Sequence, residues 1–139
     1  MDIKKLLLGG IAGAATNFLL GWLIFGTLLM DFMDKHPGAA GNIGRAEPDF
    51  LYLVIGNLCM GLLFAFIFIK ANINSLGRGF INGAIMGALM SAGYNCIWYA
   101  TTIAVSKNSM MADVGGSIAM FAISGAVIGM VVGMGKKTA

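Results

Sequence analysis

Five uncharged polar side chains stand within otherwise apolar stretches and are the residues best placed to do chemistry: Asn17, Asn57, Ser91, Asn95 and Ser124. With a helical rise of about 1.5 Å per residue, four of them fall near the middle of their stretches, and Asn95 falls somewhat further out. Such amides and hydroxyls commonly bond helices together, for about 0.6 kcal/mol a bond. A midplane polar layer can also bind a polar ligand or line a permeation path. We favour the structural role for this layer and keep the second hypothesis open.

Other constellations that could do chemistry are weaker. No Ser-His-acid set, phosphate-binding loop or pair of intramembrane carboxylates can be assembled, so we expect no enzyme, no catalytic residue and no cofactor. No ionisable residue stands deep in an apolar stretch, which argues against proton coupling. A segment between the first two stretches holds acids and a histidine, but their spacing matches no metal motif, so we interpret it as a solvated loop. Its residues are Asp31, Asp34, His36, Glu47 and Asp49.

The elements that must position these residues are membrane helices. Hydrophobic residues make up 58% of the 139 residues and charged residues 11%, whereas a soluble domain carries about 25% charge. Four apolar stretches are long enough to cross a bilayer, which takes about 20 helical residues. They run from 6 to 30, 50 to 69, 79 to 105 and 115 to 135, with an outer loop over 31–49. The sequence therefore predicts an all-α integral membrane protein, a compact four-helix bundle forming a single domain over 1–139.

The distribution of charge predicts the orientation of these four spans. One side of the membrane would hold both termini and most of the basic residues: Lys4, Lys5, Lys70, Arg78, Lys136 and Lys137. The other side would hold fewer basic residues and most acids, with Asp113 assigned to the segment before the last span. By the positive-inside rule, the N- and C-termini should be cytoplasmic. We expect localisation in a bacterial inner membrane.

Small residues recur every fourth position in three of the four spans. Such stripes let helix backbones approach closely in lipid, where the hydrophobic effect does not drive helices together. Spans one, three and four should therefore form the tight part of the bundle, and span two should face lipid. A ridge that stays free after packing, around Gly129, would dock another chain. The predicted helix-packing residues are Gly9, Gly13, Gly21, Gly79, Gly83, Gly87, Gly125, Gly129 and Gly133.

Glycine and aromatic patterns also carry a family resemblance. "GWLIFGTLLMDFM" ends the first span, and "GRGFINGAIMGAL" and "SGAVIGM" lie in the third and fourth. With these segments, most of the chain resembles the bacterial four-helix membrane family catalogued as domain of unknown function 1761. The resemblance implies a four-span fold. It implies no substrate and no catalytic residue.

Two functional hypotheses follow from the sequence. The first is an interaction protein, which associates with itself as an oligomer or with another membrane subunit as an accessory subunit of a complex. The second is a small channel or carrier that passes an uncharged or lipid-like solute through the polar layer. The expected partners are the lipid bilayer and a membrane chain, without cofactor, metal or nucleic acid.

Overall fold

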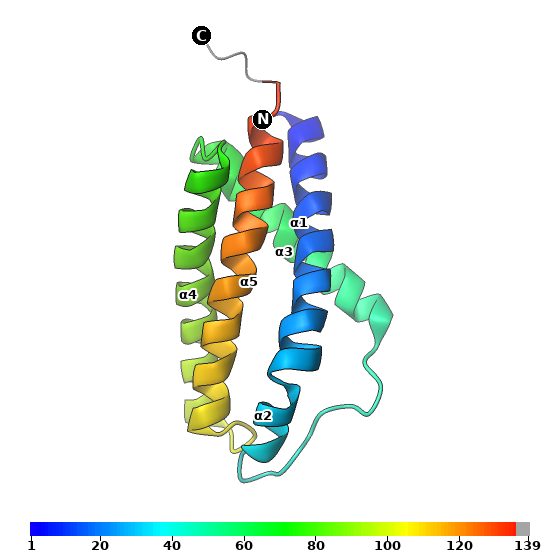
Figure 1. Cartoon of the computed structure of the whole chain (residues 1–139), viewed down its shortest axis with the longest axis vertical. Helices are drawn as coiled ribbons and strands as arrows, with labels where there is room; N and C mark the ends of the chain where they lie inside the picture. Colours follow the sequence, from blue (N-terminus) through cyan, green and yellow to red (C-terminus); the bar gives the residue numbers. More distant parts are fainter. Residues whose placement is uncertain (136–139) are drawn as a thin grey trace.

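The computed structural model describes residues 1–135, so Lys136 and Lys137 lie outside the described residues. Within this range the chain is all-helical, as predicted, apart from isolated bridges such as Pro37 with Val105. Figure 1 shows long helices side by side, with the start of the first and the end of the last at the same end. The elements are α1 (Ile3–Leu23), the π-helix η1 (Ile24–Leu28), α2 (Met30–Lys35), α3 (Phe50–Lys70), α4 (Leu76–Thr101) and α5 (Lys107–Gly133).

Within residues 1–135, three helices are long and apolar enough to cross a membrane: Ile3–Leu28, Phe50–Lys70 and Lys107–Gly133. The predicted spans one, two and four correspond to these helices. The helix α4 is as long, at 26 residues, but its glycines, two asparagines, Ser91 and Arg78 lower its hydropathy. The predicted third span is therefore a helix of sufficient length without the apolar composition of the others.

Side-chain caps explain where the long helices begin. The backbone N–H of Lys5 donates to Asp2 Oδ1 at 3.2 Å, and that of Leu51 donates to Asp49 Oδ1 at 3.1 Å. Ser75 caps α4, accepting from the Arg78 N–H at 3.4 Å. Ser106 caps α5 in the same way, so this helix begins at Lys107 and not near residue 115.

The helical geometry changes after α1, near the C-terminal end of the helix Ile3–Leu28. Leu29 N–H donates to Ile24 O at 2.8 Å, a spacing of five residues that marks the π-helical turn. The chain then continues as α2 to Lys35, which extends the helix into the predicted loop 31–49, and stops before Pro37. A π-turn shifts every side chain beyond it around the helix axis, so α2 presents a different face from α1.

The helices pack as two close pairs. The pair α4 with α5 has the most extensive contact, followed by α1 with α3, and α1 with α5 joins the two pairs. Phe64 of α3 stacks on Phe121 of α5 with ring centroids 4.9 Å apart, and Ile128 is fully buried beside them. The expectation that spans one, three and four pack tightly while span two faces lipid is thus wrong in part, because α1 packs more on α3 than on α5.

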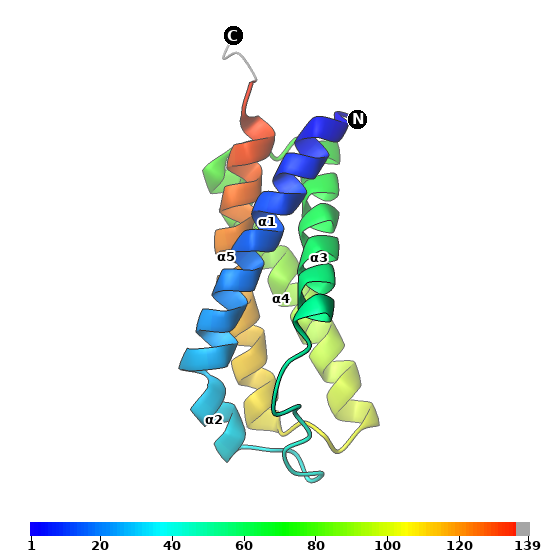
Figure 2. The same ribbon diagram turned by 90° about the vertical axis from the view of Figure 1, so that its right-hand side faces the viewer.

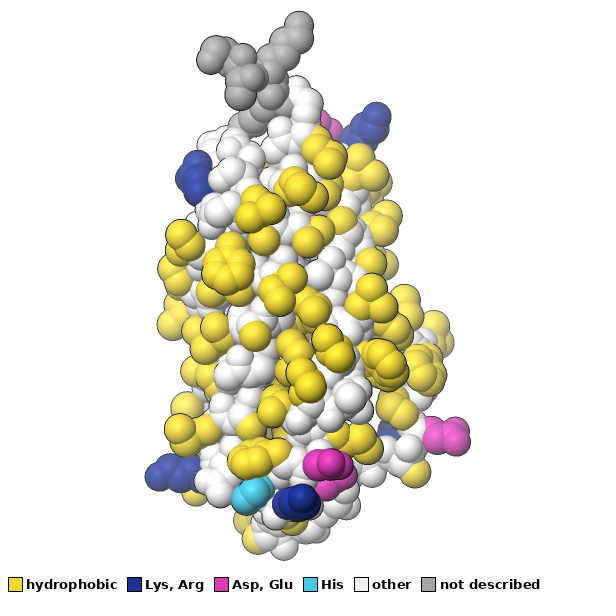
Figure 3. Space-filling model, viewed as in Figure 1, with side chains coloured by type: hydrophobic (Ala, Val, Ile, Leu, Met, Phe, Trp, Pro, Cys, Tyr) yellow, Lys and Arg dark blue, Asp and Glu magenta, His cyan; other side chains and the backbone are white. Residues whose placement is uncertain are grey.

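Charged side chains gather toward the two ends of the molecule (Figure 3). Between these ends, the face drawn in Figure 3 carries a broad band of apolar side chains. Across the described chain many large apolar residues stay exposed, among them Leu19, Leu51 and Leu89. An apolar band of this kind is expected of a surface that meets hydrocarbon.

Candidate functional site

The polar residues of α4 meet a carboxylate on α5. The Asn95 Nδ2 group donates to Asp113 Oδ2 at 2.6 Å, and Ser91 Oγ donates to the same oxygen at 3.1 Å. Ser91 and Asn95 are one helical turn apart, so both side chains point to the same place on the neighbouring helix. Both are buried, at 8% and 6% exposure. We call Ser91, Asn95 and Asp113 the carboxylate cluster.

Asp113 is not among the site residues predicted from the sequence. Because α5 begins at Lys107, Asp113 lies in its second turn, about 9 Å along the helix axis, and not in a loop. The position of Asp113, half-buried on α5, therefore differs from its expected place in a segment before the last span. The local signal that could have found it is Ser106, which caps the helix well before its apolar part.

The other three residues of the predicted polar layer, Ser124, Asn17 and Asn57, lie on three different helices and are not part of the carboxylate cluster. Ser124 of α5 is fully buried, and its Oγ donates to the Gly13 carbonyl of α1 at 3.4 Å. Asn17 is 2% exposed, and its Oδ1 accepts no hydrogen bond from any residue in 1–135. Asn57 is half-buried and donates to Leu53 O of its own helix at 2.8 Å. The five predicted residues therefore do not form one continuous layer.

The unpartnered oxygen of Asn17 gives a testable stability prediction. A buried acceptor without a donor costs about 1–3 kcal/mol, so Asn17→Leu, which keeps the branching of the side chain and removes its polar atoms, should raise the free energy of unfolding by about 1 kcal/mol. The measurement is reversible unfolding in mixed micelles, followed by helical circular dichroism. Asn57→Leu serves as the control, because Asn57 is only half-buried and its amide is already satisfied. Destabilisation by Asn17→Leu would contradict the prediction and would point to a polar role for Asn17.

The predicted glycine stripes of α4 and α5 pack on each other. A Cβ built on Gly83 would overlap Phe121 O, and one built on Gly79 would overlap Gly125 O. A Cβ on Gly87 would lie 2.7 Å from Phe121 Cβ. Backbone thus lies directly on backbone along this pair, as small-residue stripes allow. At the last turn of α5, a Cβ on Gly133 would overlap Asn74 O in the loop before α4.

The expected free ridge is not present at Gly129. A Cβ there would lie 2.5 Å from Ser75 O and 3.0 Å from Gly79 Cα, so the residue is already used inside the bundle. In α1, a Cβ on Gly9 would lie 3.2 Å from Ala65 Cβ, and one on Gly13 would lie 2.5 Å from Ile128 Cδ1. Gly21 is looser: a Cβ there would come no nearer than 3.7 Å to Met120 Sδ.

Another small-residue surface faces outward on α5. Gly115 and Ala119 are one turn apart and exposed, and a Cβ on Gly115 would meet no atom of the described chain within 4 Å. Gly56 of α3 and Gly93 of α4 are open in the same sense. We call Gly115 and Ala119 the outward ridge.

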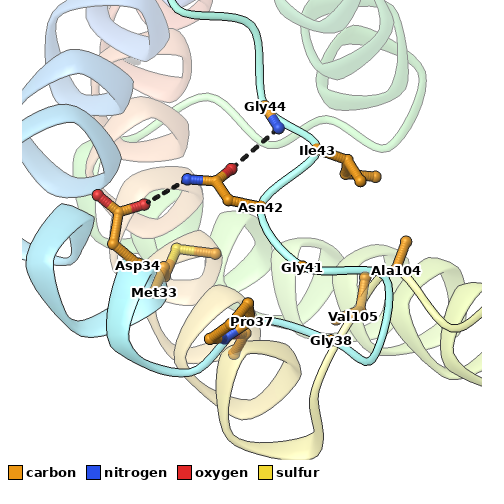
Figure 4. A pocket seen from close by; sticks show the side chains of 11 residues that line it. Met33, Asp34, Pro37, Gly38, Gly41, Asn42, Ile43, Gly44, Ala104 and Val105 are labelled. Atoms are coloured by element: carbon orange, nitrogen blue, oxygen red, sulfur yellow. Dashed lines mark hydrogen bonds between the residues drawn. The ribbon is translucent and has the colours of Figure 1, made fainter.

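The acidic outer loop is held by contacts among its own residues and with the α4–α5 connection. Asn42 Nδ2 donates to Asp34 Oδ1 at 3.2 Å, and the Gly44 N–H donates to Asn42 Oδ1 at 3.0 Å (Figure 4). Ser109 Oγ donates to His36 O at 2.6 Å. A cavity of about 160 Å³ lies beside these residues. Among residues 1–135, no three metal-ligating side chains lie close enough together to hold an ion.

Comparisons with protein-family models, with curated proteins and with solved structures find no match for this chain.

Proposed function

We propose that the chain spans the membrane four times, with both termini in the cytoplasm of a bacterium. The 26 residues of α4 are enough to cross, and α4 packs along α5, which is itself long and apolar enough. The excess of Lys and Arg at the end that holds the start of α1 supports this orientation. The four-span fold agrees with the resemblance to the family of domain of unknown function 1761, and membership of that family is part of the proposal.

Within that membrane, we propose that the protein acts by association, as an oligomer or as an accessory subunit of a larger membrane complex. One observation carries the proposal: the outward ridge of Gly115 and Ala119 is a close-packing surface that the bundle does not use. Elsewhere on α4 and α5, the glycines at this spacing are covered by a neighbouring helix. Small residues one turn apart favour helix–helix contact in lipid, because the backbones can approach closely.

Gly115→Leu tests this proposal. We expect the substitution to fill the outward ridge and to weaken association about tenfold, equivalent to about 1.4 kcal/mol. The measurement is the native mass, in mild detergent, of protein purified from its own membranes, with and without the substitution. Wild type should be found as a homo-oligomer or bound to a stoichiometric second subunit, and the Gly115→Leu variant should dissociate from it.

Gly56→Leu is the matched control, since its added side chain would also meet open space, but on α3. The control should leave association unchanged. Equal association of wild type and Gly115→Leu would rule out the outward ridge as the interface. A bare monomer in wild type would remove the association hypothesis itself.

A small channel or carrier is the second candidate, and the carboxylate cluster favours it. Asp113 changes the solute class that such a path would suit, because a carboxylate attracts cations and hydrogen-bond donors and not lipid-like solutes. Proteoliposome flux assays with wild type and Asp113→Asn would test it. Flux that requires Asp113 while association is absent would favour this candidate over the first.

A further inference from the structure

The helices α1 and α3 cross closely at one point and then separate. A Cβ on Gly61 would overlap Gly10 O, and a Cβ on Gly10 would lie 3.2 Å from Leu62 Cα, so the backbones touch there. Toward the outer end of the molecule the two helices diverge, as Figure 2 shows. A close crossing followed by divergence leaves a wedge-shaped space between two helices.

This wedge contains an open groove of about 420 Å³. Its lining is apolar apart from one amide, and that amide, on Asn57, already donates to Leu53 O. An apolar groove whose polar group is satisfied is suited to a hydrocarbon chain. The residues that matter here are Ala14, Ala15 and Phe18 on α1, and Val54, Asn57 and Leu58 on α3.

A second cavity, of about 460 Å³, lies at the start of α3. Leu53, which lines this cavity, is one helical turn from Asn57, which lines the groove, so the two follow one another along the same face of α3. Its lining includes the cation Arg45, the anion Asp49 and the phenol Tyr52. Within residues 1–135, no ion pair engages Arg45. One Asp49 oxygen caps α3, whereas the other accepts no hydrogen bond within the described chain. The cavity therefore offers both a cationic and an anionic group beside an apolar groove.

We propose that this site binds one zwitterionic phospholipid with a primary ammonium headgroup. One acyl chain lies in the groove between α1 and α3, the phosphate contacts Arg45 and Tyr52, and the ammonium contacts Asp49. Arginine suits phosphate because its planar fork donates two parallel hydrogen bonds. The charges of the cavity complement both charges of such a headgroup. A second protein chain would have to present an apolar ridge and two matched charges together, whereas a bilayer lipid carries all three in one molecule.

Native mass spectrometry of the full chain in mild detergent tests the proposal. The probes are phosphatidylethanolamine, phosphatidylglycerol and diacylglycerol with identical acyl chains. We expect one phosphatidylethanolamine per protein, bound about tenfold more tightly than either of the other two. Ala15→Leu, which fills the groove, should reduce its retention about tenfold. Ala100→Leu is the matched control, because Ala100 is equally exposed but lies on α4.

Arg45→Gln tests the headgroup site without touching helix packing, and Lys107→Gln controls for the loss of one positive charge at the same end. Arg45→Gln should abolish the preference for phosphatidylethanolamine over diacylglycerol, and Lys107→Gln should preserve it. Equal retention by Ala15→Leu and Ala100→Leu would overturn the proposal. Equal binding of phosphatidylglycerol, or a dimer that Ala15→Leu dissociates, would overturn it in favour of an anionic lipid or a second copy. Because the outward ridge lies on α5, the result is independent of the Gly115→Leu experiment.

Discussion

Gly83→Ala is expected to lower the free energy of unfolding by about 3 kcal/mol, although alanine is the better helix former by about 1 kcal/mol. The added Cβ would overlap Phe121 O and lie 3.0 Å from Gly125 Cα. Both are backbone atoms of α5, so no single side chain can rotate away and the two helices must move apart. Separation forfeits the van der Waals contacts that hold helices together in lipid. Reversible unfolding in mixed micelles, followed by helical circular dichroism, measures the loss.

Gly93→Ala is the matched control on the same helix. A Cβ at Gly93 would meet no described atom within 4 Å, so only the change in helix propensity operates there. The control should leave stability unchanged or raise it by up to about 1 kcal/mol. A similar loss of stability in both variants would show that glycine at these positions serves the helix itself and not the contact between α4 and α5.

The sequence predicts the small-residue faces better than it predicts their partners. Spacing of four residues places Gly79 and Gly83 on one face of α4, and Gly125 and Gly129 on one face of α5, and these two faces meet. Periodicity identifies a face, but any small-residue face can pack on any other, so the pairing is not encoded locally. The expectation of a free ridge at Gly129 is wrong for that reason.

The contact between α1 and α3 is a case in which small-residue periodicity fails to predict a close helix contact. Gly61 lies in a stretch rich in leucine and phenylalanine, without a stripe of small residues, yet it makes one of the closest approaches in the molecule. Two small residues of α3, Gly61 and Ala65 one turn further along, provide this approach without a longer stripe. Composition correctly predicts the all-helical class and three of the four expected apolar helices, whereas the crossing of α1 and α3 depends on tertiary structure.

The carboxylate cluster was only half visible in the sequence. Ser91 and Asn95 belong to the predicted polar layer, but the sequence places Asp113 in the segment before the last span. In the structure, the cap at Ser106 starts α5 early, and the register of α4 against α5 brings Asp113 to the two donors. Hydropathy marks where a helix is apolar, and helix capping marks where it begins, so the two boundaries need not agree.

A double-mutant cycle between Asn95 and Asp113 should yield a coupling energy of about 1.5 kcal/mol, at the upper end for polar contacts between membrane helices. The acceptor is a carboxylate and the Nδ2 to Oδ2 distance is 2.6 Å, so the bond is charge-assisted. The cycle uses Asn95→Ala, Asp113→Ala and the double variant, each unfolded reversibly in mixed micelles. Replacing Asn95 also breaks its bonds to Ser91, whether or not Asp113 is present, so the cycle cancels the contribution of those bonds.

Asp34 and Asn42 provide a control pair of the same residue types. Asn42 Nδ2, in the exposed loop after α2, donates to Asp34 Oδ1 on α2 at 3.2 Å, where water competes for both groups, so the coupling of this pair should be near zero. A coupling at Asn95 and Asp113 that is no larger than this would mean that the carboxylate does not bind α4 to α5. Asp113 would then be available to bind a solute. This outcome would favour the channel or carrier hypothesis over a structural role for Asp113.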